Sequence, residues 1–450
     1  MNLSNVLTSL QYYSFQSPSV SGLTSWIASF INLFPSIAIG VIVFTIALKL
    51  ISFPLDYFSR ASMRKNSLKM EEMRPQLEKL QKQYANDKEK YNQKMMALYK
   101  KNGYSMFGSC LPVIITLVFF IIVLNSFNDY SNFQNVKYLY NMNTSYNAII
   151  DNGIEDVIDG EVKYIYHDKE GKIIINHEEI AKLSTEELVQ KGIIVDNSIQ
   201  NKTSYSTTNA YVTLTYGYTV NEENKVYTAI TGVELDKAKY LKDNQTAYDE
   251  FLTTNSLTDS EENFEKFITD VRQSASAERF REENEKFLWV NNIWMPDTPF
   301  EHPVYSTYDS FNAKYKLENY GVSDKGQYDN LTFKLDKEKS QPNGYFILVL
   351  ITAGSSLLMQ LVSMKSNKAQ MELQSVDGQG MQQQKIMMWM MPIMMAIFAF
   401  MYTAAFSLYI IMSSVTSLLS TLLINKMVDI QINIEKKKKE AENARKVYRK

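Results

Sequence analysis

Cysteine and histidine are scarce in this sequence, with one Cys and three His among 450 residues. A single Cys excludes a disulfide framework and any Cys-rich zinc site. The three His do not have the spacing of a catalytic metal motif, so we expect no metal and no other cofactor. The formal net charge of −2 also excludes a general basic surface for DNA.

Apolar residues make up 45% of the chain and charged residues 21%, which is an ordinary average for a soluble enzyme. The average conceals five apolar stretches, each close to the roughly 20 residues that a helix needs to cross a bilayer. The sequence therefore predicts an all-α polytopic membrane protein with five transmembrane helices. The predicted spans are 35–58, 106–128, 343–364, 386–403 and 406–426.

The flanking charges predict the orientation of these spans. Residues 1–36 contain no Lys, Arg, Asp or Glu, whereas 59–105 and the tail 427–450 are rich in Lys and Arg. Cytoplasmic loops carry an excess of Lys and Arg, so we expect the N-terminus outside and the C-terminus in the cytoplasm. The loop 365–385 is then cytoplasmic, and 1–34 is an extracytoplasmic tail.

One short helix is predicted within that tail, over residues 23–34. Its apolar side chains recur at helical spacing and share one face, which is typical of a helix lying on the membrane surface. They are Trp26, Ile27, Phe30, Leu33 and Phe34.

Two segments between the spans are expected to fold outside the bilayer. Residues 59–105 consist of good helix formers with a break at Asn86–Asp87, which predicts a cytoplasmic helical hairpin. This hairpin is either a connector or a docking arm for ribosomes, nascent chains or lipid headgroups. Residues 129–342 alternate in hydrophobicity over 163–176, 210–220 and 225–235 and are helical in pattern over 236–290, which predicts an α+β extracytoplasmic insert. The insert has no nucleophile motif, phosphate loop or paired-acid signature, so we expect no enzymatic activity.

Four separated blocks of the sequence form a recognisable set. The first block is TIALKLISFPLDYFSRASMRKN (45–66), and the second runs from MRPQLEKLQKQY to GSCLP (73–112). The third is FLWVNNIWMPDTP (287–299) with 345–360, and the fourth is MQQQKIMMWMMPIMMAIF (381–398) with SLYIIMSSVTSLL (407–419). Together they resemble the YidC/Oxa1/Alb3 family of membrane protein insertases. The blocks keep the family's order, but this chain has Lys49 where the family usually has Arg. It also carries its insert between the second and third spans, where the family's loop is usually short.

The resemblance implies a bacterial plasma-membrane protein that inserts nascent membrane proteins through a polar groove open to the cytoplasm and to lipid. Lys49 lies near the middle of the first span, where a charge is costly unless it faces water or a partner. Its alternative role is a structural lysine that extends to the headgroups. The other expected groove residues are Thr45, Ser52, Ser356, Gln360 and Tyr409, although Ser in a span also serves helix packing.

The resemblance further suggests the Sec translocon as a partner, and the ribosome through the hairpin and the basic C-terminal tail. A different class of function is an extracytoplasmic receptor that binds its ligand in 129–342 and uses the spans as an anchor. A plain anchor does not need a cation at mid-membrane, which favours the insertase.

Overall fold

The computed structural model describes most of the chain in two compact units. The described residues are 6–7, 10–13, 15–84, 87–103, 107–151, 166–167, 173–174, 204–209, 211–220, 226–322, 324–373 and 379–447. The membrane unit consists of Val20–Ser131, Glu285–Pro303 and Gln341–Lys450, and the insert unit of Met1–Ser19, Asn132–Asn284 and Val304–Ser340.

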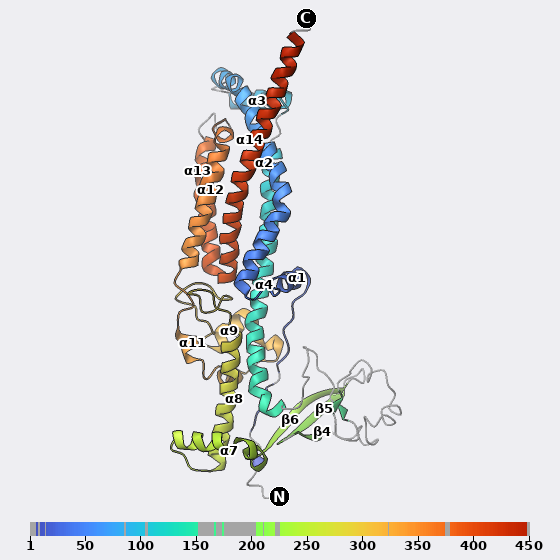
Figure 1. Ribbon diagram of the computed structural model, residues 1–450, viewed down its shortest axis with the longest axis vertical. Coiled ribbons are helices and arrows are strands. Elements are labelled where there is room, and N and C mark those ends of the chain that lie inside the picture. The colour runs from blue at the N-terminus through green and yellow to red at the C-terminus, as the bar shows by residue number, and fades with distance from the viewer. Residues whose placement is uncertain are drawn as a thin grey trace, which may run out of the picture. The chain divides into compact units, whose positions relative to one another are not determined.

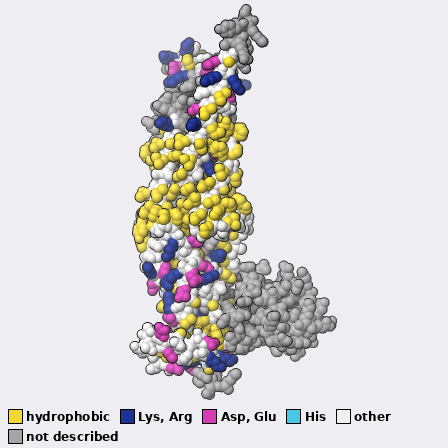
Figure 2. All heavy atoms as spheres, viewed as in Figure 1, with side chains coloured by type: hydrophobic (Ala, Val, Ile, Leu, Met, Phe, Trp, Pro, Cys, Tyr) yellow, Lys and Arg dark blue, Asp and Glu magenta, His cyan; other side chains and the backbone are white. Residues whose placement is uncertain are grey.

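Long helices form the membrane unit (Figure 1). They are α1 (Gly22–Ile31), α2 (Ile37–Gln83), α3 (Lys88–Lys101), the first part of α4 (Phe107–Asp151), α12 (Ile347–Leu373), α13 (Gln379–Met401) and α14 (Ala404–Val447). Helix α12 packs against α13, and both α12 and α14 pack against α2. In Figure 2, hydrophobic side chains form a broad band over these helices.

Three of the described helical segments are long and apolar enough to cross a membrane, whereas five spans were expected. They are Ile37–Ser59, Ile347–Lys365 and Ala404–Glu435. Helix α13 contributes a shorter apolar segment, Trp389–Met401. The expected second span lies in α4, where the side chains of residues 107–117 are outside the described set.

Helix α2 does not end at the expected boundary of the first span but continues to Gln83, so it also forms one arm of the hairpin. Asp87 begins the other arm, α3, where its carboxylate accepts a hydrogen bond from the Lys90 amide at 3.0 Å. Met73 and Leu77 on α2 are buried with Tyr99 on α3. The hairpin therefore has a small apolar core of its own.

The insert unit combines a four-stranded antiparallel sheet with helices. The sheet order is β1 (Val6–Leu7), β6 (Val226–Asp236), β5 (Val212–Val220), β4 (Ser204–Asn209), and a separate pair is formed by β2 (Tyr166–His167) and β3 (Ile173–Ile174). The helices are α7 (Lys237–Thr254), α8 (Glu261–Glu283), α9 (Tyr308–Tyr315), η3 (Leu317–Tyr320), α10 (Lys325–Leu331) and α11 (Asp336–Ser340). The helical pattern expected over 236–290 thus divides into α7 and α8, and residues 284–290 are not helical.

The N-terminal tail belongs to the insert unit rather than standing apart from it. Strand β1 pairs with β6, and Leu10 is buried in one core cluster with Val212 and Phe264. The Tyr13 carbonyl accepts hydrogen bonds from Asn143 and Asn147 of α4. Of the expected segment 1–34, residues 20–34, which contain α1, lie in the membrane unit.

The segment Glu285–Pro303, expected within the insert, is part of the membrane unit. Its carbonyls cap the last helix, because the amides of Ala404 and Ala405 donate to Met295 O and Ile293 O, both at 2.9 Å. This segment thus satisfies two of the backbone donors that every helix N-terminus leaves open.

Candidate functional site

Helix α2 carries one cation and one carboxylate within its apolar segment. Lys49 Nζ forms an ion pair with Asp56 Oδ2, seven residues further along the same helix. Their side chains are 20% and 26% exposed, so both keep part of their surface accessible. Lys49 was expected from the sequence as a lone charge, and Asp56 was missed. The seven-residue spacing, which is two turns on one helix face, was the available signal.

Two hydroxyls near Lys49 are engaged by the backbone of α2. Thr45 is buried, and its Oγ1 donates to Val41 O at 2.7 Å. Ser52 Oγ donates to the carbonyl of Lys49 at 3.1 Å. Such local bonds use the hydroxyl proton, so neither hydroxyl has a free donor.

A second polar layer joins α12 to α14. Ser356 Oγ and Ser414 Oγ lie 3.5 Å apart, and Thr421 Oγ1 contacts Met359 Sδ at 4.0 Å. Gln360 is half-buried, one helical turn beyond Ser356. These contacts place polar groups between two helices that also pack on α2.

Tyr409 is buried in an aromatic cluster. Its ring lies 5.4 Å from Phe127 of α4 and 5.7 Å from Phe406, and Phe127 in turn lies 6.1 Å from Phe44 of α2. Neither Tyr409 nor Gln360 is hydrogen-bonded to Lys49 in the described part of the chain. The expected site residues are therefore divided between the α2 pair, the α12–α14 layer and this cluster.

The described membrane unit offers polar contacts beside exposed apolar surface. Leu50, Ile51, Leu55 and Phe58 are exposed on α2 around the ion pair. No group of three or more His, Cys, Asp or Glu side chains that could hold a metal lies together among the described residues.

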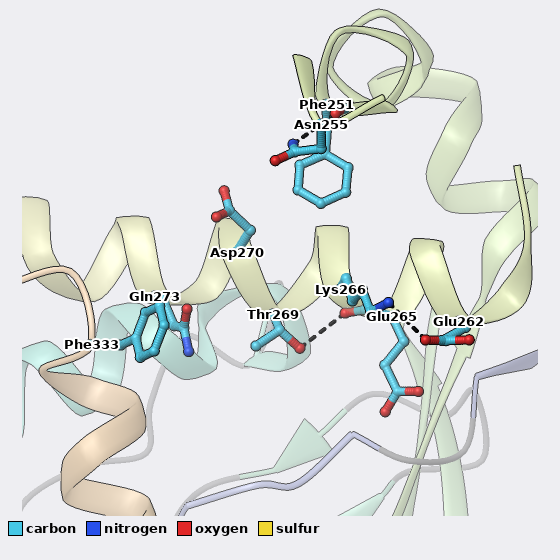
Figure 3. Close-up of a pocket in the computed structure, with 9 residues that line it drawn as sticks. All are labelled: Phe251, Asn255, Glu262, Glu265, Lys266, Thr269, Asp270, Gln273 and Phe333. Carbon is cyan, nitrogen blue, oxygen red and sulfur yellow. Dashed lines mark hydrogen bonds and ion pairs between the residues drawn. The ribbon is translucent and has the colours of Figure 1, made fainter. Parts of the chain in front are cut away.

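The insert unit has an open surface hollow of about 530 Å³ between α7, α8 and Phe333 (Figure 3). Its polar side chains interact with neighbours: Lys266 pairs with Glu262 at 2.7 Å, and Asp270 pairs with Lys334 at 2.7 Å. Thr269 Oγ1 donates to Glu265 O at 2.9 Å. Since ligand sites are usually enclosed and carry convergent polar groups, this hollow is a weaker candidate than the membrane unit.

Comparisons with a family model and with individual proteins point to the same family. The model of the family described as 60Kd inner membrane protein matches residues 26–165 and 270–431, which is more than half of the chain. The membrane protein insertase YidC of Leptospira interrogans is 36% identical over 106 residues, covering 24% of this chain and 16% of the relative. The YidC insertase of Treponema denticola is 30% identical over 110 residues, covering 24% and 18%. That of Clostridium tetani is 32% identical over 105 residues, covering 23% and 46%. The chain thus spans less than half the length of each of these relatives, and no solved structure matches it significantly.

Proposed function

Because this chain belongs to the 60Kd inner membrane protein family, we propose that it is a membrane protein insertase that moves nascent membrane proteins into the lipid bilayer. The relatives named above carry that function in their names. The observation that carries the proposal is the Lys49–Asp56 pair within the apolar segment of α2. An ionisable group at such a position is costly and is usually retained for a function.

In the proposed mechanism, a polar segment of the client enters a groove formed by α2, α12 and α14. Lys49, Thr45, Ser52, Ser356 and Gln360 line its polar side, and Tyr409 closes it towards α4. The groove shortens the apolar path that a polar segment must cross, which lowers the cost of transfer. Client hydrophobic segments leave sideways past the exposed apolar side chains of α2 into lipid. The step needs no covalent chemistry.

We further propose five spans, with the N-terminus and the insert on the outer side. Residues 1–19 fold into one unit with 132–284 and 304–340. Two segments of one folded unit must lie on the same side of the membrane, so the chain between them crosses an even number of times. Helix α2 supplies one crossing, which supports α4 as the second. Cysteine labelling from outside intact cells should modify Ser4→Cys and spare Ser62→Cys.

The hairpin and the basic end of α14 are the proposed contacts for cytoplasmic partners, the ribosome among them, and the Sec translocon is a further proposed partner. Removing residues 68–98 tests the hairpin. The variant should accumulate but insert clients poorly. Normal insertion would reduce the hairpin to a connector.

The central experiment is depletion of this protein in its own host, with two reporter clients that differ only in the charge of the translocated tail. Depletion should block both reporters. Lys49→Arg should restore both, because a guanidinium remains cationic. Lys49→Gln should restore the neutral reporter better than the acidic one. Unimpaired insertion of both reporters after depletion would exclude the proposed insertase function.

A further inference from the structure

The cation on α2 differs from a lone groove cation because the Lys49 ammonium already binds a carboxylate of its own helix. Ile37–Ser59 contains two charged side chains, Lys49 and Asp56, and they bind each other. Resting on the insertase function above, we propose that Asp56 is a specificity-determining residue that occupies Lys49 until an acidic group of the client displaces it.

The geometry sets where the cation lies. The backbones of Lys49 and Asp56 are separated by about 10.5 Å along the helix axis, at about 1.5 Å per residue. Lysine side chains on a helix ordinarily lean towards its N-terminus. Lys49 instead extends towards the hairpin end of α2 to reach Asp56. The ammonium group is therefore held on the hairpin side of its own backbone, where an entering polar segment would arrive.

The energetics allow an exchange. Both side chains keep part of their surface accessible, so a client carboxylate can reach the ammonium group. A client carboxylate that replaces Asp56 forms an equivalent pair, so the exchange has a small cost. A neutral client leaves the pair intact and gains nothing from Lys49. Asp56 thus lowers the affinity for acidic clients without abolishing it.

Asp56 also limits what Lys49 would otherwise do. An unpaired ammonium in an apolar segment would attract any anion, lipid phosphate included. The internal carboxylate neutralises that charge at rest, because it is tethered to the same helix and competes at high effective concentration. Discrimination between clients is then set by both residues together.

The test compares the acidic and the neutral reporter in full-length variants, with protein level measured in parallel. Asp56→Asn should raise the acidic-to-neutral insertion ratio by roughly two- to five-fold, the factor that an exposed ion pair supplies. Asp56→Glu keeps the carboxylate and should stay at the parental ratio. The matched control is Asp129→Asn, an exposed carboxylate on α4, which should also leave the ratio unchanged. The double variant Lys49→Gln with Asp56→Asn should lose the preference for either tail.

An unchanged or lower ratio in Asp56→Asn would overturn the proposal. So would loss of the Asp56→Asn protein combined with normal levels of the double variant, because the pair would then be a structural bridge. These outcomes differ from failure of the insertase function, in which the parent chain itself would insert neither reporter.

Discussion

The Asp297 carboxylate caps the first turn of α12 by accepting a hydrogen bond from the Leu348 amide. Its Oδ2 accepts the amide N–H of Leu348 at 2.5 Å, and its Oδ1 accepts that of Tyr345 at 2.8 Å. Asp297 is completely buried, and the indole of Trp289 also donates to it at 3.3 Å. A carboxylate at this place satisfies open backbone donors and complements the positive end of the helix dipole. The segment Glu285–Pro303 thereby fixes the start of an apolar helix far along the chain.

Replacing Asp297 with Asn should destabilise the membrane unit by about 1–3 kcal/mol, the cost of leaving buried donors without an acceptor. The amide nitrogen of Asn cannot accept a hydrogen bond, so at least one backbone N–H loses its partner. The measurement is the thermal unfolding midpoint of the detergent-solubilised protein. Glu440→Gln, an exposed carboxylate on α14, is the control and should not change the midpoint. Equal midpoints for the two variants would contradict the capping role.

Arg272 should prove essential to the insert unit although it lies outside any site. It is buried, and its guanidinium stacks on the Tyr146 ring with 3.9 Å to the centroid. It donates to the carbonyls of Tyr146 and Gln11, at 2.9 and 2.8 Å, and so ties the N-terminal tail to α4. Hydrogen bonds from charged donors contribute about 1.5–3 kcal/mol each, and lysine cannot reproduce the planar fork. Arg272→Lys should therefore destabilise this unit by about 2–3 kcal/mol.

Limited proteolysis of the full chain measures this effect, because cleavage within the insert unit reports its opening. The control is Arg279→Lys, an exposed side chain on the same helix that pairs with Glu283. Exposed pairs contribute little, so its cleavage rate should match the parent. Equal protection of both variants would show that Arg272 does not hold the tail.

The insert unit should also lose stability at high pH through Tyr248. Burial raises the pKa of Tyr248 to about 12, and its hydroxyl donates to Asp259 Oδ1 at 2.9 Å. A folded-state pKa above the ordinary value means that the folded unit favours the neutral phenol. Its contribution is complete below about pH 10 and disappears as the pH rises through 12. Tyr248→Phe should therefore lose less stability than the parent chain as the pH rises from 10 to 12.

The measurement is the urea concentration at which protease protection of the insert unit is lost, at several pH values between 8 and 12. Tyr240 also has a pKa raised to about 12 by burial, so Tyr248→Phe should retain some alkaline sensitivity. A parent chain with the same urea midpoint at pH 9 and pH 12 would contradict both assignments.

The sequence predicted those strands and helices whose pattern of apolar and polar side chains lies within the element itself. The alternation over 210–220 and 225–235 coincides with β5 and β6, and the helical pattern from 236 onwards contains α7 and α8. Helix α2 runs through the predicted boundary at residue 58, because good helix formers follow the apolar segment and nothing ends the helix before Gln83. Its apolar part, Ile37–Ser59, ends one residue past the predicted span.

Contacts between distant segments have no comparable pattern in the sequence from which they could be predicted. Arg272 binds backbone carbonyls, and any residue supplies a carbonyl, so the partnership with Gln11 cannot be deduced from residue types. The same holds for Glu285–Pro303, whose carbonyls cap α14. Lys49 was identified as a candidate because a cation in an apolar run is conspicuous. Asp56 was overlooked because it lies near the end of that run. Because Asp56 is present, removing Lys49 alone leaves a carboxylate without its partner in the apolar segment of α2.

The last prediction concerns Gly40, where α1 crosses α2. A Cβ at this position would meet Ile31 O at 2.5 Å and Ile31 Cγ2 at 2.8 Å, so the two helices are too close for any side chain there. Ile31 is fully buried, and Trp26 and Phe30 of α1 both pack their rings on Phe44. Gly40→Ala should therefore displace α1 and destabilise its contact by about 1–3 kcal/mol, the usual cost of overpacking.

Intrinsic helix propensity acts in the opposite direction, because Ala favours a helix over Gly by about 1 kcal/mol. Gly354→Ala isolates that gain: Gly354 lies within α12, and nothing is within 4 Å of a Cβ placed there. We expect Gly354→Ala to keep or raise the thermal midpoint of the solubilised protein and Gly40→Ala to lower it. Protease sensitivity near residue 20 should increase in Gly40→Ala alone, since only that substitution releases α1. If both variants gain stability equally, α1 is not held against α2 at this crossing.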